Sequence, residues 1–197
     1  QRMSRAMSDA FDGLELSRFQ MEPSRCSYLP DEQSALEYRI LAGISAVGFQ
    51  KMLERGWRRH GWHFFRPACP HSNKCQSLRL DVNTFMPTKS QRRAFNKNSE
   101  VRVEVAMPDV TPDHVRLYNA WHADMHVRSG WRDDQITASG YANSFLTGNW
   151  SFAREFRYFR EDTLIGVGLV DVLPDALSSV YFYHDPAWRA DSPGTYT

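Results

Sequence analysis

The chain holds three cysteines, Cys26, Cys69 and Cys75, the last two on either side of a short polar loop. Thiolates and imidazoles are the usual ligands of structural zinc, which takes four of them in a tetrahedron. With His71 or His63 as the fourth ligand, the thiols could hold a zinc ion, and an Fe–S cluster held by the thiolates is a further option. The spacing is looser than a CxxC pair, and cysteines packed as small apolar side chains are an equal alternative.

Basic side chains without interspersed acidic ones follow this loop, in the segment 90–98 with the sequence SQRRAFNKN. Thr88 or Ser90 can cap it as a short helix. A second basic run lies between Trp57 and Trp62. Guanidinium groups and aromatic planes bind phosphates and bases, so both segments indicate a nucleic-acid partner, the alternative being core tryptophans and solvated charges. The basic residues of the two segments are Arg58, Arg59, Lys89, Arg92, Arg93 and Lys97.

Composition favours a globular protein of one large or two small domains. The 197 residues are 42% hydrophobic and include 24 Lys and Arg against 23 Asp and Glu, so the net charge of +1 does not by itself indicate a polyanion partner. The odd number of cysteines and the lack of an apolar leader favour a reducing cytoplasm over secretion. No apolar run approaches the roughly 20 residues that cross a bilayer, so no membrane partner is expected.

Alternating apolar residues predict strands over 36–41, 63–67 and 77–85 in the first half of the chain. Between the first two strands, Ser45 is expected to cap a helix and Gly56 to end it. The apolar faces are expected to be formed by Leu36, Tyr38 and Ile40 in the first strand, Val47, Met52 and Leu53 in the helix, Leu78, Leu80 and Val82 in the third strand, and Phe95 in the basic helix.

The second half is predicted to form a helix and then an antiparallel meander. A helix start is expected at Thr111-Pro112-Asp113, where an N-cap residue precedes proline. Strands are expected over 153–160, 163–172 and 177–184. Further expectations are a strand over 99–107, a hairpin turn at Glu161-Asp162, and a core stripe of the helix formed by Leu117, Trp121 and Met125.

Several motifs in a fixed order make the chain resemble the aminoacyl-tRNA–protein transferase family, from Cys26 almost to the end. They are CSYLP, LEYRILAGIS, ERGWRRHGWHFFRPACP, PTKSQRRAFNKN, GVGLVDVLPDALSSVYFYHDP and GTY. The motifs are closer to the bacterial branch, which transfers leucine to N-terminal Asp or Glu, than to the eukaryotic arginyltransferases, which carry a second cysteine where this chain has Leu29. The bacterial pattern often has another cysteine at the position of Ser72, so either His71 substitutes as a ligand or no metal is bound.

The resemblance implies an α+β fold, with a small cysteine-containing N-terminal domain followed by an acetyltransferase-like (GNAT-like) domain built on an antiparallel or mixed sheet. We expect a lead-in over 1–24, the N-terminal transferase domain over 25–108 and the GNAT-like catalytic domain over 109–197. Family members normally continue with a helix, a strand and a tyrosine-rich segment. The catalytic domain is therefore expected to be truncated at its C-terminus.

The activity implied by the resemblance is acyl transfer, in which the α-amine of a protein N-terminus attacks the ester of an aminoacyl-tRNA. No cofactor is required for this chemistry, because the ester is already activated. The catalytic candidates are Tyr181, His184 and Asp185, with His184 standing where the family commonly has tyrosine. Arg66 and Arg79 are candidates for binding the acidic N-terminal residue. The tRNA, favoured as leucyl-tRNA, is expected to lie along the six basic residues given above.

Three other functions stay open at this point. An arginyl-tRNA–protein transferase is the nearest alternative. A small-molecule N-acetyltransferase would share the second-half fold but needs a Gly-rich pyrophosphate loop, where this chain offers only Ser192-Pro193-Gly194. A non-catalytic, zinc-containing RNA-binding module would explain the cysteines and the basic helix but leaves the second half without a task. Transfer of a destabilising residue would place the protein in the N-degron pathway of protein degradation.

Overall fold

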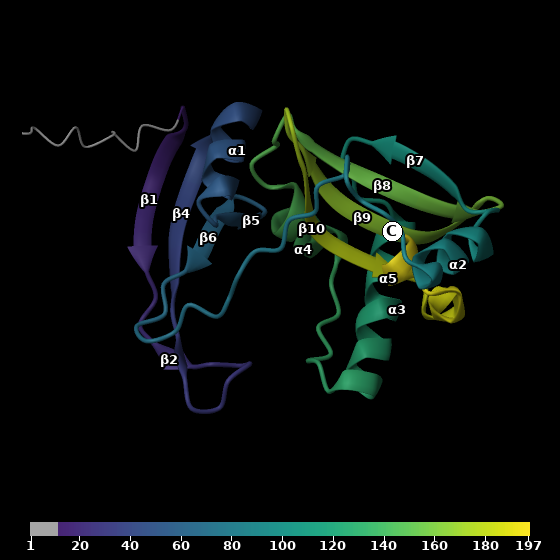
Figure 1. Cartoon of the computed structure of the whole chain (residues 1–197), viewed down its shortest axis with the longest axis horizontal. Helices are drawn as coiled ribbons and strands as arrows, with labels where there is room; N and C mark the ends of the chain where they lie inside the picture. Colours follow the sequence, from purple (N-terminus) through teal and green to yellow (C-terminus); the bar gives the residue numbers. More distant parts are fainter. Residues whose placement is uncertain (1–11) are drawn as a thin grey trace, which may run out of the picture.

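The structure, a computed structural model, describes residues 12–197 and contains two four-stranded antiparallel sheets in this range (Figure 1). The first sheet has the strand order β1-β4-β6-β5 and the second the order β10-β9-β8-β7. The predicted α+β class is confirmed. The first sheet consists of β1 (Leu14–Gln20), β4 (Leu36–Gly43), β5 (Arg58–His60) and β6 (His63–Pro67), and the second of β7 (Arg102–Ala106), β8 (Ala153–Arg160), β9 (Thr163–Val172) and β10 (Leu177–His184).

The helices lie between and beside the sheets, and β2 and β3 form a separate short ribbon. The bounds of these remaining elements are β2 (Ser24–Arg25), β3 (Gln33–Ser34), α1 (Ala46–Glu54), α2 (Lys89–Lys97), α3 (Pro112–Ser129), α4 (Ala138–Tyr141), the π-helix η1 (Ala142–Leu146), the 3-10 helix η2 (Pro186–Asp191) and α5 (Pro193–Tyr196). No helix in the described part of the chain is both long and apolar enough to cross a membrane.

Side-chain caps start the helices where the sequence predicts. Ser45 caps α1, Thr111 caps α3, and Thr88 forms a capping box with Gln91 at the start of α2. Each cap oxygen accepts a hydrogen bond from a backbone N–H that has no partner inside the helix. Gly56 follows α1 with φ +83°, as expected of a helix stop. The predicted meander and its turn are confirmed by β8, β9 and β10.

Strand β4 is observed, but its more buried face is the opposite of the predicted apolar face. Glu37, Arg39 and Leu41 are 9%, 7% and 0% exposed, whereas the alternate residues are half-buried. Burial of Glu37 is tolerated because Arg18 and Arg66 both bind its carboxylate, Arg66 at 2.7 Å. The alternating pattern therefore predicted the strand correctly. It did not predict which face is more buried, because ion pairs allow the face with Glu37 to be buried.

Two helices bury different side chains from those predicted. In α1, Phe49 is fully buried and Val47 is 51% exposed. In α2, Ala94 is buried and Phe95 is 65% exposed. The short α2 packs through its small residue because it lies close against α5.

The predicted strand over 77–85 is wrong. Residues 70–88 contain no helix or strand, and Leu78, Leu80 and Val82 are 93%, 62% and 78% exposed. A strand needs a neighbour to pair its backbone N–H and C=O groups. Strand β6, which was expected beside this segment, is already paired on one edge by β4 and on the other by β5.

Aromatic side chains from both halves of the chain form the core between the sheets. Phe49 lies 5.1 Å from Phe64 and 5.3 Å from Phe152, measured between ring centroids. A buried ion pair joins Arg59 of β5 to Asp171 of β9, with Nε donating to Oδ2 at 2.8 Å. Each buried aromatic contributes about 1.5–3 kcal/mol, so these contacts hold β5 firmly against the second sheet.

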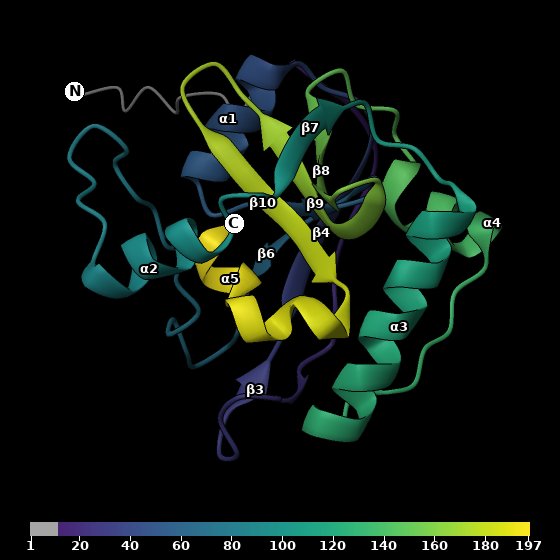
Figure 2. The same cartoon turned by 90° about the vertical axis from the view of Figure 1, so that its right-hand side faces the viewer.

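Helices cover both faces of the second sheet (Figure 2). On one face, Leu117 and Tyr118 of α3 pack against Val167 and Tyr183. On the other face, Trp188 of η2 packs among a separate group of residues, Val101, Tyr158 and Ile165. Residues from β10 can therefore reach two different environments, depending on which face they occupy.

The chain enters the second sheet with β7, before the expected domain boundary at residue 108. β7 pairs with β8, and the Lys97 side chain at the end of α2 binds Asp191 at 3.1 Å. At the other end, β1 pairs with β4 and so belongs to the first sheet, although it falls in the expected lead-in. The first part of that lead-in, residues 1–11, lies outside the described residues.

Candidate active site at the inter-sheet seam

The two sheets meet where β5 lies against β10, a contact between Arg58, His60, Ser179 and Tyr181 that we call the inter-sheet seam (Figure 1). Arg58 and His60 lie on the face of β5 directed to β10, while Arg59 points the opposite way into its buried ion pair. Arg58 Nη2 donates to the Ser179 carbonyl oxygen at 2.9 Å, and the His60 and Tyr181 ring centroids are 6.4 Å apart. The strand period of two therefore places an arginine and a histidine side by side.

A β-bulge in β10 and the helix α3 together position Tyr181. The register of β10 against β9 shifts between Ser179 and Tyr181, an irregularity that is common next to active sites. The Tyr181 hydroxyl lies 3.0 Å from Nε2 of His122. One helical turn earlier, Tyr118 stacks on His122 with ring centroids 4.1 Å apart, and its ring lies 6.2 Å from that of Tyr181. A hydroxyl and an imidazole are thus held in contact at the seam.

Burial keeps these groups uncharged. Burial lowers the pKa of His122, although the nearby carboxylate of Asp134 opposes the shift, and burial raises the pKa of Tyr181. Burial and the charge of Arg59 lower the pKa of His60. Because an unperturbed histidine has a pKa of about 6.5, both imidazoles are neutral at pH 7, while Tyr181 stays a phenol.

One ring nitrogen of His122 forms no hydrogen bond to any described residue. Its side chain is 8% exposed, and among the described residues its Nδ1 has no hydrogen-bond partner. A buried polar atom without a partner costs about 1–3 kcal/mol, so such atoms are rare away from functional sites. This nitrogen is a further sign that the surroundings of His122 receive a ligand.

The π-helix η1 closes one side of the seam. Its Phe145 lies 4.9 Å from His60 and 5.4 Å from Tyr181, measured between ring centroids. The turn after β5 fits against η1 because Gly61, with φ +56°, has no Cβ: an added Cβ would lie 2.8 Å from the carbonyl oxygen of Ser144. Single π-turns are frequent at functional sites.

The seam combines the groups that acyl transfer to an amine requires. A neutral imidazole can accept a proton from an ammonium group, and a phenol can donate a hydrogen bond to an oxyanion. The guanidinium of Arg58 adds a cation at the edge of the same site. Acyl or proton transfer is therefore the chemistry that this arrangement supports.

Of the three catalytic candidates from the sequence, the structure brings only Tyr181 to the seam. His184 is 5% exposed, packs 4.3 Å from the Trp121 ring, and its Nδ1 lies 2.7 Å from the Asp185 carbonyl oxygen. The Asp185 side chain accepts a hydrogen bond from Ala187 N and so caps η2. Tyr181 and His184 are an odd number of residues apart after the bulge and occupy opposite faces of β10.

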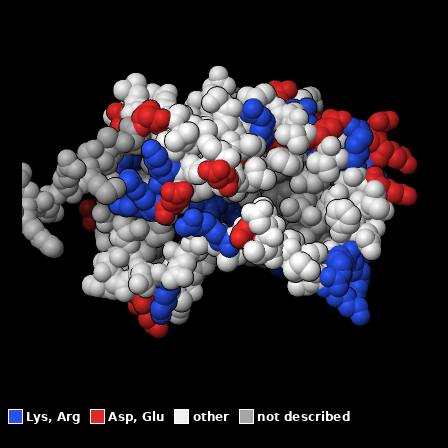
Figure 3. Space-filling model, turned by 45° about the horizontal axis from the view of Figure 1, so that its top comes forward, with Lys and Arg blue, Asp and Glu red and all other residues white. Residues whose placement is uncertain are grey.

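The six basic residues expected to bind tRNA do not form one surface. Arg59 is buried in its ion pair with Asp171, which corrects its expected role, and Lys97 is paired with Asp191. Arg58 lies at the seam. On this face of the molecule, basic side chains occur in separate groups among acidic ones (Figure 3). The exposed basic residues that remain on α2 are Lys89, Arg92 and Arg93.

Arg66 and Arg79, the candidates for binding an acidic N-terminus, line one groove of about 490 Å³. The end of α1, the end of β6 and the segment 70–88 form its walls. The Arg66 guanidinium is already bound to Glu37 at 2.7 Å and lies 4.8 Å from the ring centre of Trp57. The groove is basic, but one of its two arginines is committed to another side chain.

The cysteine ligands proposed for a metal are only partly brought together. Among residues 12–197, the structure contains no group of three or more Cys, His, Asp or Glu side chains arranged to hold a metal ion. Cys69 and Cys75 line the groove of Arg66 and Arg79, whereas Cys26 accepts a hydrogen bond from Tyr28 N. A tetrahedral zinc site needs four ligands around one point, so the metal site stays a prediction.

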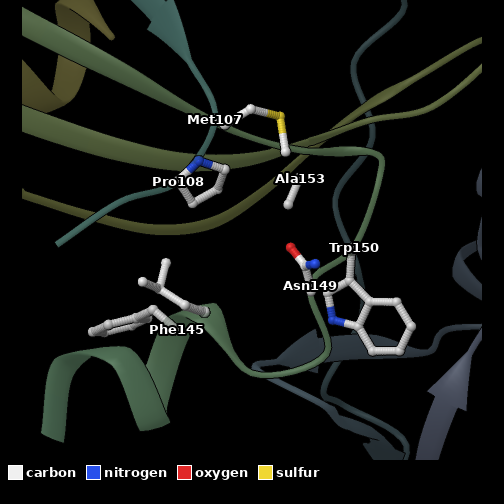
Figure 4. Close-up of a pocket in the computed structure, with 7 residues that line it drawn as sticks. Met107, Pro108, Phe145, Asn149, Trp150 and Ala153 are labelled. Carbon is white, nitrogen blue, oxygen red and sulfur yellow. The ribbon is translucent and has the colours of Figure 1, made fainter. Parts of the chain in front are cut away.

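A small cavity of about 40 Å³ lies behind Phe145, the ring that also borders the seam (Figure 4). Met107 and Pro108 face Phe145 across it, and Asn149 and Trp150 form a third side. The lining is uncharged and combines apolar side chains with the amide of Asn149.

His60, Tyr118 and His122 are the seam residues that the sequence did not single out. Tyr118 and His122 are four residues apart in α3 and so share a face, which is visible from the sequence alone. Their partner Tyr181 is 59 residues away from His122, and no local pattern predicts that contact. His60 was overlooked because the basic run around it predicted a phosphate-binding surface instead of a strand.

Comparisons with known proteins identify the family of the chain. Residues 24–93 match the family model described as arginine-tRNA-protein transferase, N terminus, and residues 113–197 match the model for the C terminus. An aspartate/glutamate leucyltransferase of Helicobacter hepaticus is 34% identical over 182 residues, which cover 92% of this chain and 76% of that protein.

Two further relatives carry the same name. The protein of Campylobacter jejuni strain 81116 is 34% identical over 88% of this chain and 72% of its own length. That of Pseudomonas fluorescens is 31% identical over 92% of this chain and 78% of its own length. The resemblance inferred from the motifs is thereby confirmed over both halves of the chain, and the protein belongs to the aminoacyl-tRNA–protein transferase family.

Proposed function

We propose that this protein transfers leucine from leucyl-tRNA to the N-terminal Asp or Glu of proteins. The observation that carries the proposal is the match of 92% of the chain to a relative named aspartate/glutamate leucyltransferase. The inter-sheet seam supports it, because a neutral histidine, a tyrosine and an arginine meet there. In the cytoplasm, where charged tRNA is found, the added leucine would mark the acceptor for degradation.

In the proposed reaction, the α-amine of the acceptor attacks the carbonyl carbon of the aminoacyl ester. A C–N bond forms, the ester C–O bond breaks, and the tRNA ribose oxygen leaves as a hydroxyl. The ammonium must first lose a proton, which passes by way of the Tyr181 hydroxyl to the neutral imidazole of His122. The carboxylate of Asp134 stabilises the imidazolium that results. The nitrogen loses a second proton as the C–N bond forms, so one of the two protons goes to the leaving oxygen and the other to solvent.

Leucine is favoured over arginine as the transferred residue by the lining of the small cavity. Phe145 separates this cavity from the seam, so an aminoacyl side chain entering past Phe145 would meet Met107, Pro108 and Leu146. An arginine side chain would need a carboxylate, and none lines the cavity. Arginyl transfer remains the second candidate because the family model carries that description.

The tRNA is proposed to contact the exposed basic side of α2. Lys89, Arg92 and Arg93 project from one short helix that contains no acidic residue. Phosphate contacts of this kind position a nucleic acid without reading its sequence. The acceptor's acidic residue also needs a cation: the groove of Arg66 and Arg79 is one candidate, and Arg58 at the seam is another.

Transfer can be tested with purified protein, labelled leucyl-tRNA or arginyl-tRNA, and peptides that begin with Asp, Glu, Asn or Gln. We expect leucine to be transferred to the Asp and Glu peptides and arginine to be transferred much more slowly. Met107→Trp should reduce leucine transfer by filling the cavity, whereas Met86→Trp, at an exposed residue outside it, should not. Equal use of arginyl-tRNA would replace the proposal with the second candidate.

A further inference from the structure

Arg58 differs from the other arginines of the first sheet in forming no direct ion pair among the described residues, although the carboxylate of Asp171, which is bound to Arg59, lies near enough to interact with its charge. Its Nη2 donates to the carbonyl oxygen of Ser179, a neutral acceptor, and within residues 12–197 it forms no ion pair. By contrast, Arg59 is paired with Asp171 and Arg66 with Glu37. A guanidinium has five N–H donors, so the one bond to Ser179 leaves most of them available to a ligand.

The position of Arg58 is fixed from two directions. It lies on β5 between the buried Trp57 and the buried Arg59, so its backbone cannot shift without disturbing the core. Its contact with Ser179 falls next to the bulge that precedes Tyr181 on β10. The side chain is half-buried and therefore still reaches solvent.

Arg58 and His60 lie close enough together for one acidic N-terminal residue to reach both of their surroundings. Two residues along a strand are roughly 6.6 Å apart, and both side chains point to the same side. The α-amine and the side-chain carboxylate of Asp or Glu are separated by about three or four covalent bonds, roughly 4–5 Å. Because the Arg58 side chain donates to Ser179, two residues before Tyr181, a carboxylate on Arg58 leaves the α-amine on the Tyr181 side of the seam.

We infer that Arg58 is the residue that selects acidic acceptors, by binding the side-chain carboxylate of the N-terminal Asp or Glu while the α-amine lies at Tyr181. Asn and Gln have nearly the same shape but no charge, so they are rejected by the missing ion pair and not by size. The inference rests on the proposed function and deepens it. It also places the binding site for the acceptor's side-chain carboxylate at the seam instead of in the groove of Arg66 and Arg79.

The test compares Arg58→Met and Arg58→Lys with the unaltered protein, using peptides that begin with Asp, Glu, Asn and Gln. For Arg58→Met, kcat/KM for leucine transfer to the Asp and Glu peptides should fall about 10- to 100-fold, because a hydrogen bond to a charged group is lost. The already slow transfer to the Asn and Gln peptides should change little, and urea unfolding of Arg58→Met checks that the variant is folded. Arg58→Lys should retain part of the preference, since charge is kept but the planar fork is lost.

A binding measurement separates this inference from the proposed function. Titration of the protein with the Asp and Asn peptides, without tRNA, should show weaker binding of the Asp peptide by Arg58→Met, and Arg116→Met on the exposed side of α3 is the matched control. A preference for Asp that depends on Arg58, without leucine transfer, would overturn the proposed function and support the inference. A preference that survives in Arg58→Met but is lost in Arg66→Met or Arg79→Met would overturn the inference.

Discussion

The inter-sheet seam and the segment 70–88 carry similar kinds of side chains but hold them in different ways. Both contain arginine and histidine, and both involve the first sheet: the seam includes β5 itself, and the segment 70–88 comes after β6. At the seam, His122 and Tyr181 are fixed by α3, by η1 and by a bulge in β10. In the segment 70–88, His71 and Cys75 are exposed and no regular element holds them.

This difference shows that a reactive type of residue is not enough for catalysis, because the residue must also be held in position. A catalytic group must be kept within a fraction of an ångström of its working geometry, and only packing supplies that precision. The segment 70–88 contains residue types that could react or bind a metal, but no helix or strand of the described chain holds them in place. At the seam, the reactive residues are held in fixed positions. We therefore expect substitutions at the seam to affect catalysis most and substitutions in the segment to affect it least.

The largest effect is expected from removing the contact between Tyr181 and His122. Tyr181→Phe and His122→Ala should each lower kcat by about 10²- to 10⁴-fold, because general acid–base catalysis is lost. Tyr158→Phe is the matched control, since Tyr158 is a tyrosine of the same sheet that is 7% exposed and faces Trp188 on the other side. Single-turnover rates of leucine transfer measure the effect. Undiminished rates in both seam variants would place the chemistry elsewhere.

A smaller effect is expected from pushing β5 away from η1. Gly61→Ala forces a Cβ to within 2.8 Å of the Ser144 carbonyl oxygen and keeps an unfavourable positive φ. We expect a loss of about 1–3 kcal/mol in the free energy of unfolding, together with slower transfer. Gly56→Ala has a positive φ but no atom within 4 Å of the added Cβ, so the difference between the two variants in urea unfolding isolates the contact.

The elements of the second sheet could be predicted from the sequence, but the seam could not. Strands over 153–184 and the start of α3 depend on local signals, namely alternation, a hairpin turn and an N-cap followed by proline. The contact of His122 with Tyr181 depends on how β10 packs on α3, which no window of sequence contains. Tyr181 was a candidate only because the resemblance directed attention to its motif.

The failures of prediction have one physical cause. The segment 77–85 and β9 were both predicted as strands from local signals, yet β9 has β8 and β10 as partners and the segment has none. Similarly, Arg59 was expected to bind phosphate because the sequence shows its charge but not Asp171, its partner 112 residues away. Local pattern describes what a segment is able to form, and long-range pairing decides what it does form.

The neutral state of the seam histidines predicts how stability depends on pH. Burial lowers the pKa of His60 and His122 below the unfolded value of about 6.5, so the unfolded state binds more protons as the pH falls. Their contribution is complete above pH 6.5 and is lost below it, at no more than about 1.4 kcal/mol per pH unit for each residue. Urea unfolding between pH 8 and pH 5 measures this slope, and His122→Gln should make it shallower. An unchanged slope in that variant would show that His122 does not titrate differently on folding.

The smallest effect is expected in the segment 70–88, at the position where the strand prediction failed. Leu78 is 93% exposed, so Leu78→Ser should change the free energy of unfolding by less than about 0.5 kcal/mol. The same change at Leu164, which is 6% exposed and lies in a predicted strand that the structure contains, should cost about 2–5 kcal/mol. Both values come from urea unfolding at pH 7. Equal losses at the two leucines would mean that residues 77–85 do bury an apolar face, and the contrast between the two regions would then disappear.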